Sequence, residues 1–303
     1  CNGTIVAQER SHCERGLVMK LLAHTFIIAL ALALAIPAHA GKRVALVIGN
    51  DAYESLPALR KAVNDARAVG AALGDLGFEV IAGENLSRRD MNKRIAELEK
   101  AIAPGDTVFF FFAGHGVALG GDNILLPADM PSPQPGEDGL VREEGFAVDS
   151  IIRRVQKRGA ETAFLVLDAC RNNPFEAGGA RDIGQERGLA RVDAPSGVFV
   201  LFSAGIGQTA LDRLPNDDDE NSVFTRKLVP ILKTPGLTHV AIAKRLQREV
   251  GALAATVKHK QQPAYYDQID GEIVLNGSAP ETAVAAAEPI VAAEESEGFL
   301  AKL

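Results

Sequence analysis

Residues 107–116 read TVFFFFAGHG, a run of β-branched and aromatic residues that ends in two glycines flanking a histidine. Residues 162–170 read TAFLVLDAC and repeat the pattern, with an apolar run that ends in an aspartate and a cysteine. Apolar runs of this length, without polar alternation, predict strands that are buried on both faces. Such strands belong to a mainly parallel sheet whose two faces are covered by helices.

The segments on either side of these runs alternate between strand and helix patterns. Strands are expected at residues 43–49, 78–82 and 197–202, with shorter ones at 123–128 and 272–275. Helical spacing of apolar residues predicts helices at 59–76, 87–102, 148–158, 222–232 and 239–257. Strands alternating with helices predict the α/β class, here a three-layer α/β/α sandwich with a mainly parallel sheet.

The beginning of the chain has the pattern of a secretory signal peptide. A basic start at residues 19–20 precedes an apolar run at 21–36 and the small-x-small sequence Ala-His-Ala at 38–40. We therefore expect residues 19–40 to be removed and the protein to be exported, to the periplasm of a bacterium or beyond. An uncleaved anchor is the alternative, because the apolar run approaches the length that crosses a bilayer.

Three further segments complete the expected organisation. Residues 1–18 begin with a cysteine and show no periodicity, so they are an upstream extension or an artefact, with Met19 as the expected start. Residues 41–277 are expected to form one folded domain. Residues 278–303 are rich in alanine and glutamate with scattered prolines, which is typical of a flexible tail.

Charge and cysteine content narrow the class of protein. The formal net charge of the 303 residues is −7, and it becomes −8 without residues 1–40, which carry three basic and two acidic residues. We therefore expect no nucleic-acid partner, and no membrane contact after the leader is removed.

Removal of the leader leaves Cys170 as the only one of three cysteines. A single thiol in an exported protein forms no internal disulfide, so it must be buried or used.

Reactive residues follow two of the expected central strands. His115 comes after the run at 107–112, and Cys170 after the run at 162–167. The carboxyl ends of parallel strands meet at one edge of the sheet, where α/β proteins form their sites, so we expect both residues there on adjacent loops. An imidazole can take the proton of a thiol, and the resulting thiolate is a nucleophile. The pair therefore predicts covalent catalysis.

Other interpretations of these two residues remain open. A lone histidine is often a satisfied polar residue, and a lone cysteine often behaves as an inert small hydrophobe. One histidine and one cysteine are too few ligands for a structural zinc ion, so no metal is expected. If the pair is catalytic, the backbone amides of Gly116 and Cys170 are candidates for binding an oxyanion.

Two aspartates are expected at the same edge. Asp168 precedes Cys170 by two residues, so the two share a strand face, and Asp65 lies near the first turn of the first helix. A carboxylate in an apolar strand must be paired or solvated, so Asp168 either accepts loop amides or lines an acidic recess for a cation. Asp65 taken alone is structural, because aspartate is favoured near helix N-termini.

The order and spacing of these motifs resemble those of the caspase and metacaspase superfamily of cysteine peptidases. Caspases place Gln-Ala-Cys about 50 residues after the histidine, and this chain has Asp-Ala-Cys, its cysteine 55 residues after His115. The supporting motifs are VIGN at 47–50, LRKAVNDA at 59–66, FAGHG at 112–116, LDACRNNP at 167–174 and VLFS at 200–203. The resemblance implies a caspase-like peptidase domain within residues 41–277, with Cys170 as nucleophile and His115 as general base.

The resemblance also implies a substrate class. Caspases cut after aspartate and carry glutamine at the position of Asp168, whereas metacaspases cut after arginine or lysine and carry aspartates at the positions of Asp65 and Asp168. Aspartates attract a guanidinium through charge-assisted hydrogen bonds and repel a carboxylate. The expected partners are thus proteins or peptides with arginine or lysine before the cut, and Ser203 is expected to line the same site. Ala62 and Ala113 replace a cysteine and a serine that metacaspases often have, so the finer contacts of the pocket differ.

Three expectations complete the family comparison. Family members can be cut in the linker that corresponds to residues 171–196, so self-cleavage at one of its arginines is a hypothesis, and a surface loop is the alternative. No cofactor is expected, because the acidic run at 217–220 lacks the spacing of a calcium loop, although calcium dependence stays open. The alternative function is a non-catalytic interaction protein with a caspase-like fold. Such relatives commonly lose the histidine or the cysteine, and this chain keeps both.

Overall fold

The computed structural model describes residues 41–170, 175, 190, 192 and 194–277, with Cys170 described by its backbone alone. The expectations of a signal peptide, a self-cleaved linker and a flexible tail therefore fall on residues outside the described part of the chain. Within the described part, no helix is long and apolar enough to cross a membrane.

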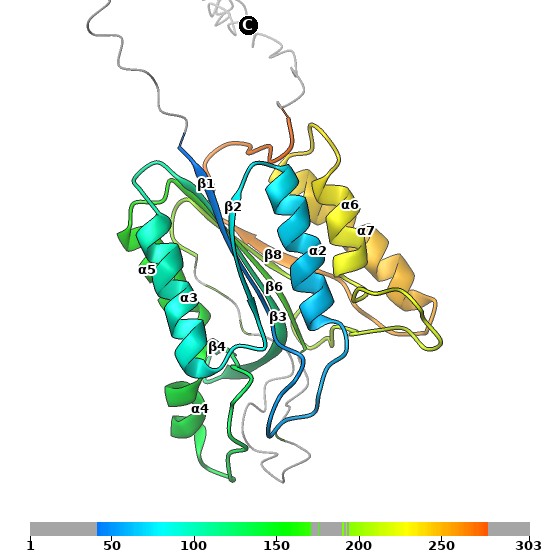
Figure 1. The fold of residues 1–303 in the computed structure, drawn as a ribbon. Coiled ribbons are helices and arrows are strands. Elements are labelled where there is room, and N and C mark those ends of the chain that lie inside the picture. Colours follow the sequence, from blue (N-terminus) through cyan, green and yellow to red (C-terminus); the bar gives the residue numbers. More distant parts are fainter. Residues whose placement is uncertain (1–40, 171–174, 176–189, 191, 193, 278–303) are drawn as a thin grey trace, which may run out of the picture. The chain divides into compact units, whose positions relative to one another are not determined.

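A twisted sheet forms the middle layer (Figure 1). Its strands lie in the order β2 (Glu79–Glu84), β1 (Arg43–Gly49), β3 (Thr107–Leu119), β6 (Thr162–Cys170), β7 (Val198–Phe202) and β8 (Ala264–Asp267). Neighbouring strands are parallel, except that the edge strand β8 runs antiparallel to β7. Two short strands, β4 (Asp122–Leu125) and β5 (Phe146–Ala147), form a small antiparallel extension of β3.

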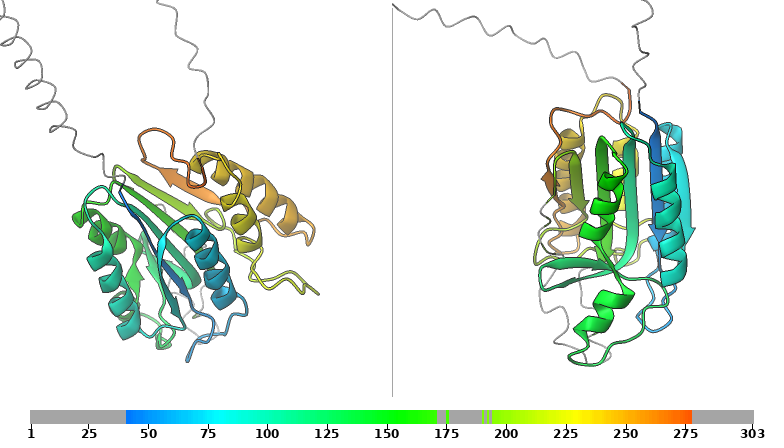
Figure 2. Two further views of the ribbon diagram at one scale, coloured as in Figure 1. Left: turned by 45° about the horizontal axis from the view of Figure 1, so that its top comes forward. Right: turned by 90° about the vertical axis from the view of Figure 1, so that its left-hand side faces the viewer.

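Helices cover both faces of this sheet (Figure 2). One face is covered by α2 (Ala62–Asp75), α6 (Thr225–Leu232) and α7 (His239–Ala255), and the other by α3 (Arg88–Ala101) and α5 (Val148–Lys157). The short helix α4 (Asp138–Glu144) lies just before β5. The expected three-layer α/β/α sandwich with a mainly parallel sheet is confirmed.

The aromatic run of β3 explains why a strand without polar alternation is stable here. Phe109 and Phe111 pack into the core under α2, α6 and α7, whereas Phe110 and Phe112 pack into the core under α3 and α5. Successive side chains of a strand point to opposite faces, so both faces must be apolar when both are covered.

Helix ends follow the local signals in the sequence. Ser87 caps α3, because its hydroxyl accepts a hydrogen bond from the backbone N–H of Asp90. Gly77 follows α2 with a φ of 79°, a left-handed conformation that glycine adopts without steric cost. These signals predict the two ends to within a few residues.

Other details of the sequence prediction are wrong. The expected strand at 272–275 is not formed, and Val274 makes only an isolated bridge with Thr238. That segment is apolar because Leu275 and Ile273 pack against the core, so it has the composition of a strand without its pairing. The edge position belongs instead to β8, whose four residues are only half-buried.

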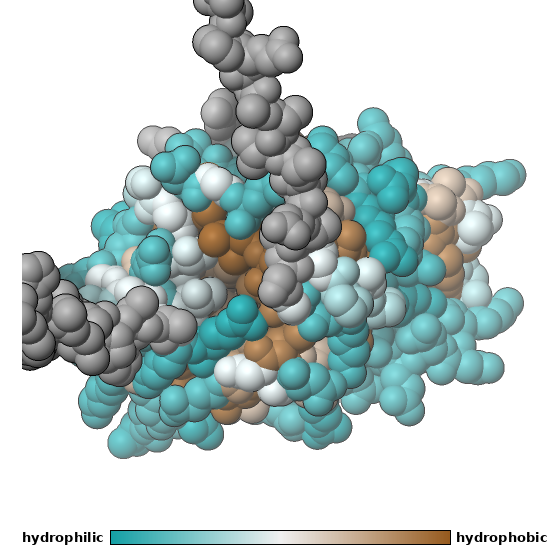
Figure 3. All heavy atoms as spheres, turned by 90° about the horizontal axis from the view of Figure 1, so that it is seen from above, coloured by the Kyte–Doolittle hydropathy of each residue, from teal (hydrophilic) through white to brown (hydrophobic). Residues whose placement is uncertain are grey.

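The two ends of the sheet differ in the residues that they carry. Figure 3 looks onto the amino ends of the parallel strands, where most of the visible described surface is hydrophilic around a small central hydrophobic area. The candidate site residues lie at the opposite, carboxyl end. Among the described large hydrophobic residues, Ile206 is the one that is strongly exposed, at 63% of its surface.

Candidate active site

His115 and Cys170 lie side by side at the carboxyl edge of the sheet. They form the last register pair between β3 and β6. On the other side of β3, the pairing with β1 ends at Gly49 and Ala113, and from Gly116 onward β3 pairs with β4. The two residues thus meet at one edge of the sheet as expected, but they lie in the adjacent strands β3 and β6 and not on the adjacent loops that the sequence predicted.

The imidazole of His115 is buried and held in one tautomer. Its Nε2 lies 2.7 Å from the carbonyl oxygen of Pro57. A carbonyl oxygen only accepts hydrogen bonds, so Nε2 carries the proton and donates it. Nδ1 is then the unprotonated nitrogen, and it is buried without a hydrogen-bond partner among the described residues. Such a nitrogen is ready to accept a proton from a group beside it.

Burial also keeps this imidazole neutral. Loss of solvation lowers the pKa of His115, and the hydrogen bond to Pro57 opposes part of that effect. A neutral imidazole can act as a base, whereas a protonated one cannot. The environment of His115 therefore favours the form that a general base requires.

The carbonyl of Pro57 was not predicted from the sequence. It belongs to the segment between β1 and α2, which folds back on itself through a hydrogen bond from Leu59 N to Asp51 O at 3.0 Å. The side chain of Asn85 fixes the start of this segment by accepting the amides of Asp51 and Ala52, each at 2.9 Å. Every residue has a carbonyl, so no residue type could have marked this one.

A small pocket next to the pair contains three carboxyl groups. They come from Asp65 in the first turn of α2, Asp168 on β6 and Asp212 in the segment after β7. The other lining residues are Leu59, Ala62, Ala113, Gly114, Ala210, Leu211 and Ser222. The structure thus brings together the two aspartates that the sequence indicated and adds a third.

Neutral groups hold the two inner carboxyls. Asp65 Oδ1 accepts from the Asn221 side chain at 3.1 Å and from the Ser222 amide at 2.9 Å. Asp168 Oδ2 accepts from the hydroxyls of Ser222 at 2.6 Å and Thr225 at 3.1 Å. Among the described residues, every donor to these two carboxyls is uncharged. The pocket therefore contains two buried acids that no cation in the described part of the chain neutralises.

The pKa values of the two carboxyls reflect this arrangement. Burial raises the pKa of Asp65 well above its usual value, and the negative charge of Asp168 raises it further. Burial likewise raises the pKa of Asp168, although the nearby hydroxyls oppose that shift. In the absence of a cation, protonation of the pair is favoured.

Asp212 is held more loosely at the outer side of the pocket. It accepts hydrogen bonds from the backbone amides of Arg60 and Lys61 at 3.2 Å each. Burial raises its pKa, and these amides oppose the shift. It had no recognisable motif, because its position depends on how the segment after β7 returns to the N-terminal end of α2.

Two other predicted site residues, Ser203 and Gly116, do not line this pocket. Ser203 is fully buried and does not line the pocket. Its hydroxyl makes no hydrogen bond of regular geometry, yet it lies close enough to lower the pKa of Asp168. Gly116 is paired with Leu125 of β4, directly after the last pair of β3 with β6. Ser203 thus supports a pocket residue, and Gly116 lies where the β3–β6 ladder ends.

Arg226 fixes the segment that delivers the neutral donors. Its guanidinium donates to Asp217 Oδ2 at 2.5 Å and to the carbonyl oxygens of Asn221 and Ser222 at 2.7 and 3.1 Å. This ion pair lowers the pKa of Asp217 to about 2. Two carboxylates of the acidic run, those of Asp217 and Asp219, are therefore used in holding the segment. Within the described ranges, no three His, Cys, Asp or Glu side chains are grouped so as to hold a metal ion.

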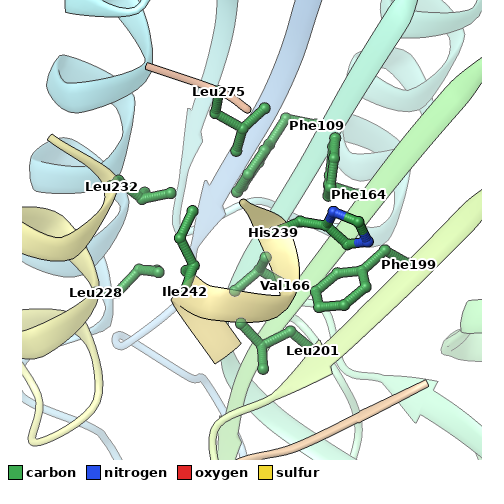
Figure 4. A pocket seen from close by; sticks show the side chains of 10 residues that line it. All are labelled: Phe109, Phe164, Val166, Phe199, Leu201, Leu228, Leu232, His239, Ile242 and Leu275. Atoms are coloured by element: carbon green, nitrogen blue, oxygen red, sulfur yellow. The ribbon is translucent and has the colours of Figure 1, made fainter. Parts of the chain in front are cut away.

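A second, small pocket lies between the sheet and helices α6 and α7 (Figure 4). Its lining is apolar apart from His239. Both nitrogens of that imidazole are used, since Nε2 lies 3.1 Å from Asp267 Oδ2 and Nδ1 accepts from Ile273 N at 3.2 Å. His239 therefore joins α7, β8 and the chain after β8, and no nitrogen is left for chemistry.

Comparisons with known proteins agree with these features. A family model described as a caspase domain matches residues 42–273. The mucosa-associated lymphoid tissue lymphoma translocation protein 1 of Homo sapiens and its homolog of Mus musculus are each 28% identical to this chain over 129 residues. The match covers 43% of this chain and 15% of each relative, so the chain corresponds to a small part of those proteins.

Proposed function

The chain belongs to the caspase-domain family, and from this premise we propose that it is a cysteine endopeptidase that cuts proteins or peptides after arginine or lysine. One observation supports the chemistry most directly. His115 has an unprotonated, buried Nδ1 without a described partner, and its backbone lies beside that of Cys170. The family supplies the general activity, and this geometry supports the roles of the two residues.

The proposed reaction begins with proton transfer. Nδ1 of His115 takes the proton of the Cys170 thiol, and the thiolate attacks the carbonyl carbon of the scissile bond. The imidazolium then gives its proton to the leaving amine, so that an acyl-enzyme remains on the sulfur. Water, deprotonated by the same nitrogen, releases the acid product and regenerates the thiol. Throughout, the Pro57 carbonyl accepts a hydrogen bond from Nε2–H of His115 and stabilises the transient positive charge.

The backbone amides of Gly116 and Cys170 are the proposed oxyanion donors. Cys170 belongs to the last pair of the β3–β6 ladder, and Gly116 follows that pair directly. The β3–β6 pairing has no further residue pair beyond this point, so these amides can donate to a substrate without breaking the ladder between the two strands. Donors aimed at the developing negative charge of the tetrahedral intermediate contribute several kcal/mol in acyl-transfer enzymes, about 2.7–4 kcal/mol for one donor.

The acidic pocket is the proposed binding site for the side chain before the cut. A guanidinium or ammonium group would supply the cation that no described residue provides to Asp65 and Asp168, and Asp212 would meet it near the opening. Binding would release the protons that the buried carboxyls favour when the pocket is empty. A carboxylate side chain would be repelled by the same groups.

Two further parts of the proposal concern residues outside the described ranges. The segment at 171–196 contains Arg171, Arg181, Arg187 and Arg191, so an enzyme of this specificity has candidate sites for cutting its own chain. Export through the signal peptide at 19–40 would place the activity in the periplasm or outside the cell. No cofactor takes part in the proposed reaction.

Matched fluorogenic peptides that end in arginine, lysine or aspartate test the function. We expect the protein from residue 41 onward to hydrolyse the first two and not the third, and Cys170→Ala to abolish hydrolysis. Cleavage after aspartate would keep the peptidase and overturn the role of Asp65 and Asp168. A lack of hydrolysis of all three, with and without calcium and with the linker cut or intact, would instead support a non-catalytic interaction protein.

A further inference from the structure

The hydroxyl of Tyr53 is inserted into the backbone pairing at His115. The amide of Leu126 donates to His115 O at 3.0 Å, as in an antiparallel pair that exchanges two hydrogen bonds. The second bond of such a pair would run from His115 N to Leu126 O. Instead, His115 N donates to Tyr53 Oη at 2.7 Å, and this hydroxyl donates to Leu126 O at 3.3 Å.

This insertion occurs where β3 changes partners. The register of β1 with β3 ends at Ala113, and β4 is in register only from Gly116 onward. His115 is therefore the position at which one neighbouring strand has ended and the next has not yet begun. The hydroxyl satisfies both the donor and the acceptor left at this junction.

The ring of Tyr53 also contacts the imidazole. The two ring centroids are 4.5 Å apart, and the planes are inclined by 48°. Close approach is possible because Gly114 has no side chain, and a Cβ there would lie 2.7 Å from Tyr53 Oη. Tyr53 is itself buried, with 8% of its surface exposed, so its ring has little freedom to move away.

Tyr53 and Pro57 belong to the same short segment. That segment thus contacts His115 at its backbone N–H, at its ring face and at Nε2. The backbone amide of Glu54, next to Tyr53, donates to Ala128 O at 3.0 Å and ties the segment to the chain after β4. One loop, between β1 and α2, therefore holds His115 at three places.

We propose that Tyr53 is a positioning residue for His115. Its hydroxyl fixes the position of the His115 backbone where β3 changes partners, and its ring fixes the orientation of the imidazole plane. Together they keep Nε2 on the Pro57 carbonyl and Nδ1 free on the side away from it. This proposal rests on the proposed function, in which that Nδ1 is the general base.

The test uses Tyr53→Phe, with Tyr265→Phe as the matched control. Tyr265 undergoes the same loss of one hydroxyl, and its described side-chain contacts are ring contacts with Phe199 and Lys244. For an arginine peptide, we expect Tyr53→Phe to lower kcat by about 10- to 100-fold with KM changed less than about threefold, because small misplacements of catalytic groups act on the chemical step. A kcat equal to that of the control would overturn the proposal.

A second readout does not depend on peptide hydrolysis. In the wild-type protein, ¹⁵N NMR of the imidazole should show His115 as the tautomer protonated at Nε2. Tyr53→Phe should mix the two tautomers, and Gly114→Ala, which presses on the same hydroxyl, should do so if Tyr53→Phe is poorly folded. Unchanged ¹⁵N shifts in folded variants would overturn the proposal. If the wild-type protein cuts no peptide, the proposed function fails while these shifts still decide the role of Tyr53.

Discussion

The negative charge of Asp168 raises the pKa of Asp65 within one buried pocket, and no described cation donates a hydrogen bond to either carboxyl. Buried acids are costly for a fold unless they are paired. The proposed substrate would provide that pairing. Recognition of a cationic substrate therefore requires the two carboxyls to be buried and unpaired, whereas the stability of the free protein is lowered by them.

Asp168→Asn tests the recognition side of this relationship. Loss of one partner of a buried charge pair typically costs 2 kcal/mol or more, so we expect kcat/KM for an arginine peptide to fall by about 30-fold or more. Steady-state hydrolysis measures the change. Asp270→Asn, an exposed aspartate outside the pocket, is the control and should leave kcat/KM within about twofold. Equal values for the two variants would remove Asp168 from the substrate site.

Asp65→Asn tests the stability side. A carboxyl whose pKa is raised by folding contributes stability below its unfolded pKa, about 3.9, and loses it as the pH rises through the folded value. The asparagine variant does not titrate, so its stability relative to the wild type should increase between pH 4 and 8. Urea unfolding across that range measures the difference.

Asp90→Asn is the control of opposite sign. Hydrogen bonds from Lys93 and Ser87 lower the pKa of Asp90, so the wild type gains stability over this variant only as the pH rises toward the unfolded pKa of about 3.9. Between pH 4 and 8 the stability of Asp90→Asn relative to the wild type should therefore stay constant. If Asp65→Asn and Asp90→Asn showed the same pH trend, the raised pKa of Asp65 would be wrong.

Alkylation of Cys170 by iodoacetamide reports on the base without a substrate. Because burial lowers the pKa of His115, the neutral imidazole should persist below pH 6.5, and the alkylation rate should remain high to that pH. His115→Ala should move the midpoint toward the value of a free thiol, about 8.5. His259→Ala is the control, since its imidazole contacts the Thr209 carbonyl instead. A midpoint near 8.5 in the wild type would indicate an inert thiol and favour the non-catalytic alternative.

Arg226→Gln tests whether the segment at 217–222 shapes the pocket. Without the guanidinium, the Asp217 carboxylate and the Asn221 carbonyl lose a donor, and the Ser222 carbonyl keeps only the backbone amide of residue 226. The groups that hold the pocket carboxyls should then become mobile. We expect KM for arginine peptides to rise by about tenfold, with little change in the alkylation of Cys170. Lys227→Gln removes the neighbouring charge as a control. A parallel loss of alkylation would mean that Arg226 acts on the whole fold.

The sequence predicted the parts of the site that depend on strand direction. His115 and Cys170 follow apolar runs, and parallel strands bring such positions to one edge. Asp168 lies on the same strand as Cys170, so its place followed as well. The layers of the fold were equally predictable, because unbroken apolar strands require cover on both faces.

The remaining parts depend on chain paths that no local pattern encodes. Pro57 contributes a backbone carbonyl, and Tyr53 contributes a hydroxyl at a strand junction that was not expected, since β3 was predicted to end before His115. Asp212 reaches the pocket through an irregular segment. Ser203 belongs to a family motif, yet it is buried beside Asp168 and does not line the pocket. A motif can therefore lie at a site without contacting the pocket.

One continuous strand, β3, serves two sheets: His115 is its last residue paired in the large one, and Gly116 is its first in the small one. The proposed base and one proposed oxyanion donor are therefore consecutive residues, at the point where β3 leaves the large sheet and enters the small one. Because β4 pairs with Gly116 and the amide that follows β4, that of Leu126, donates to His115 O, the pairing of the small sheet fixes the base and the oxyanion donor together.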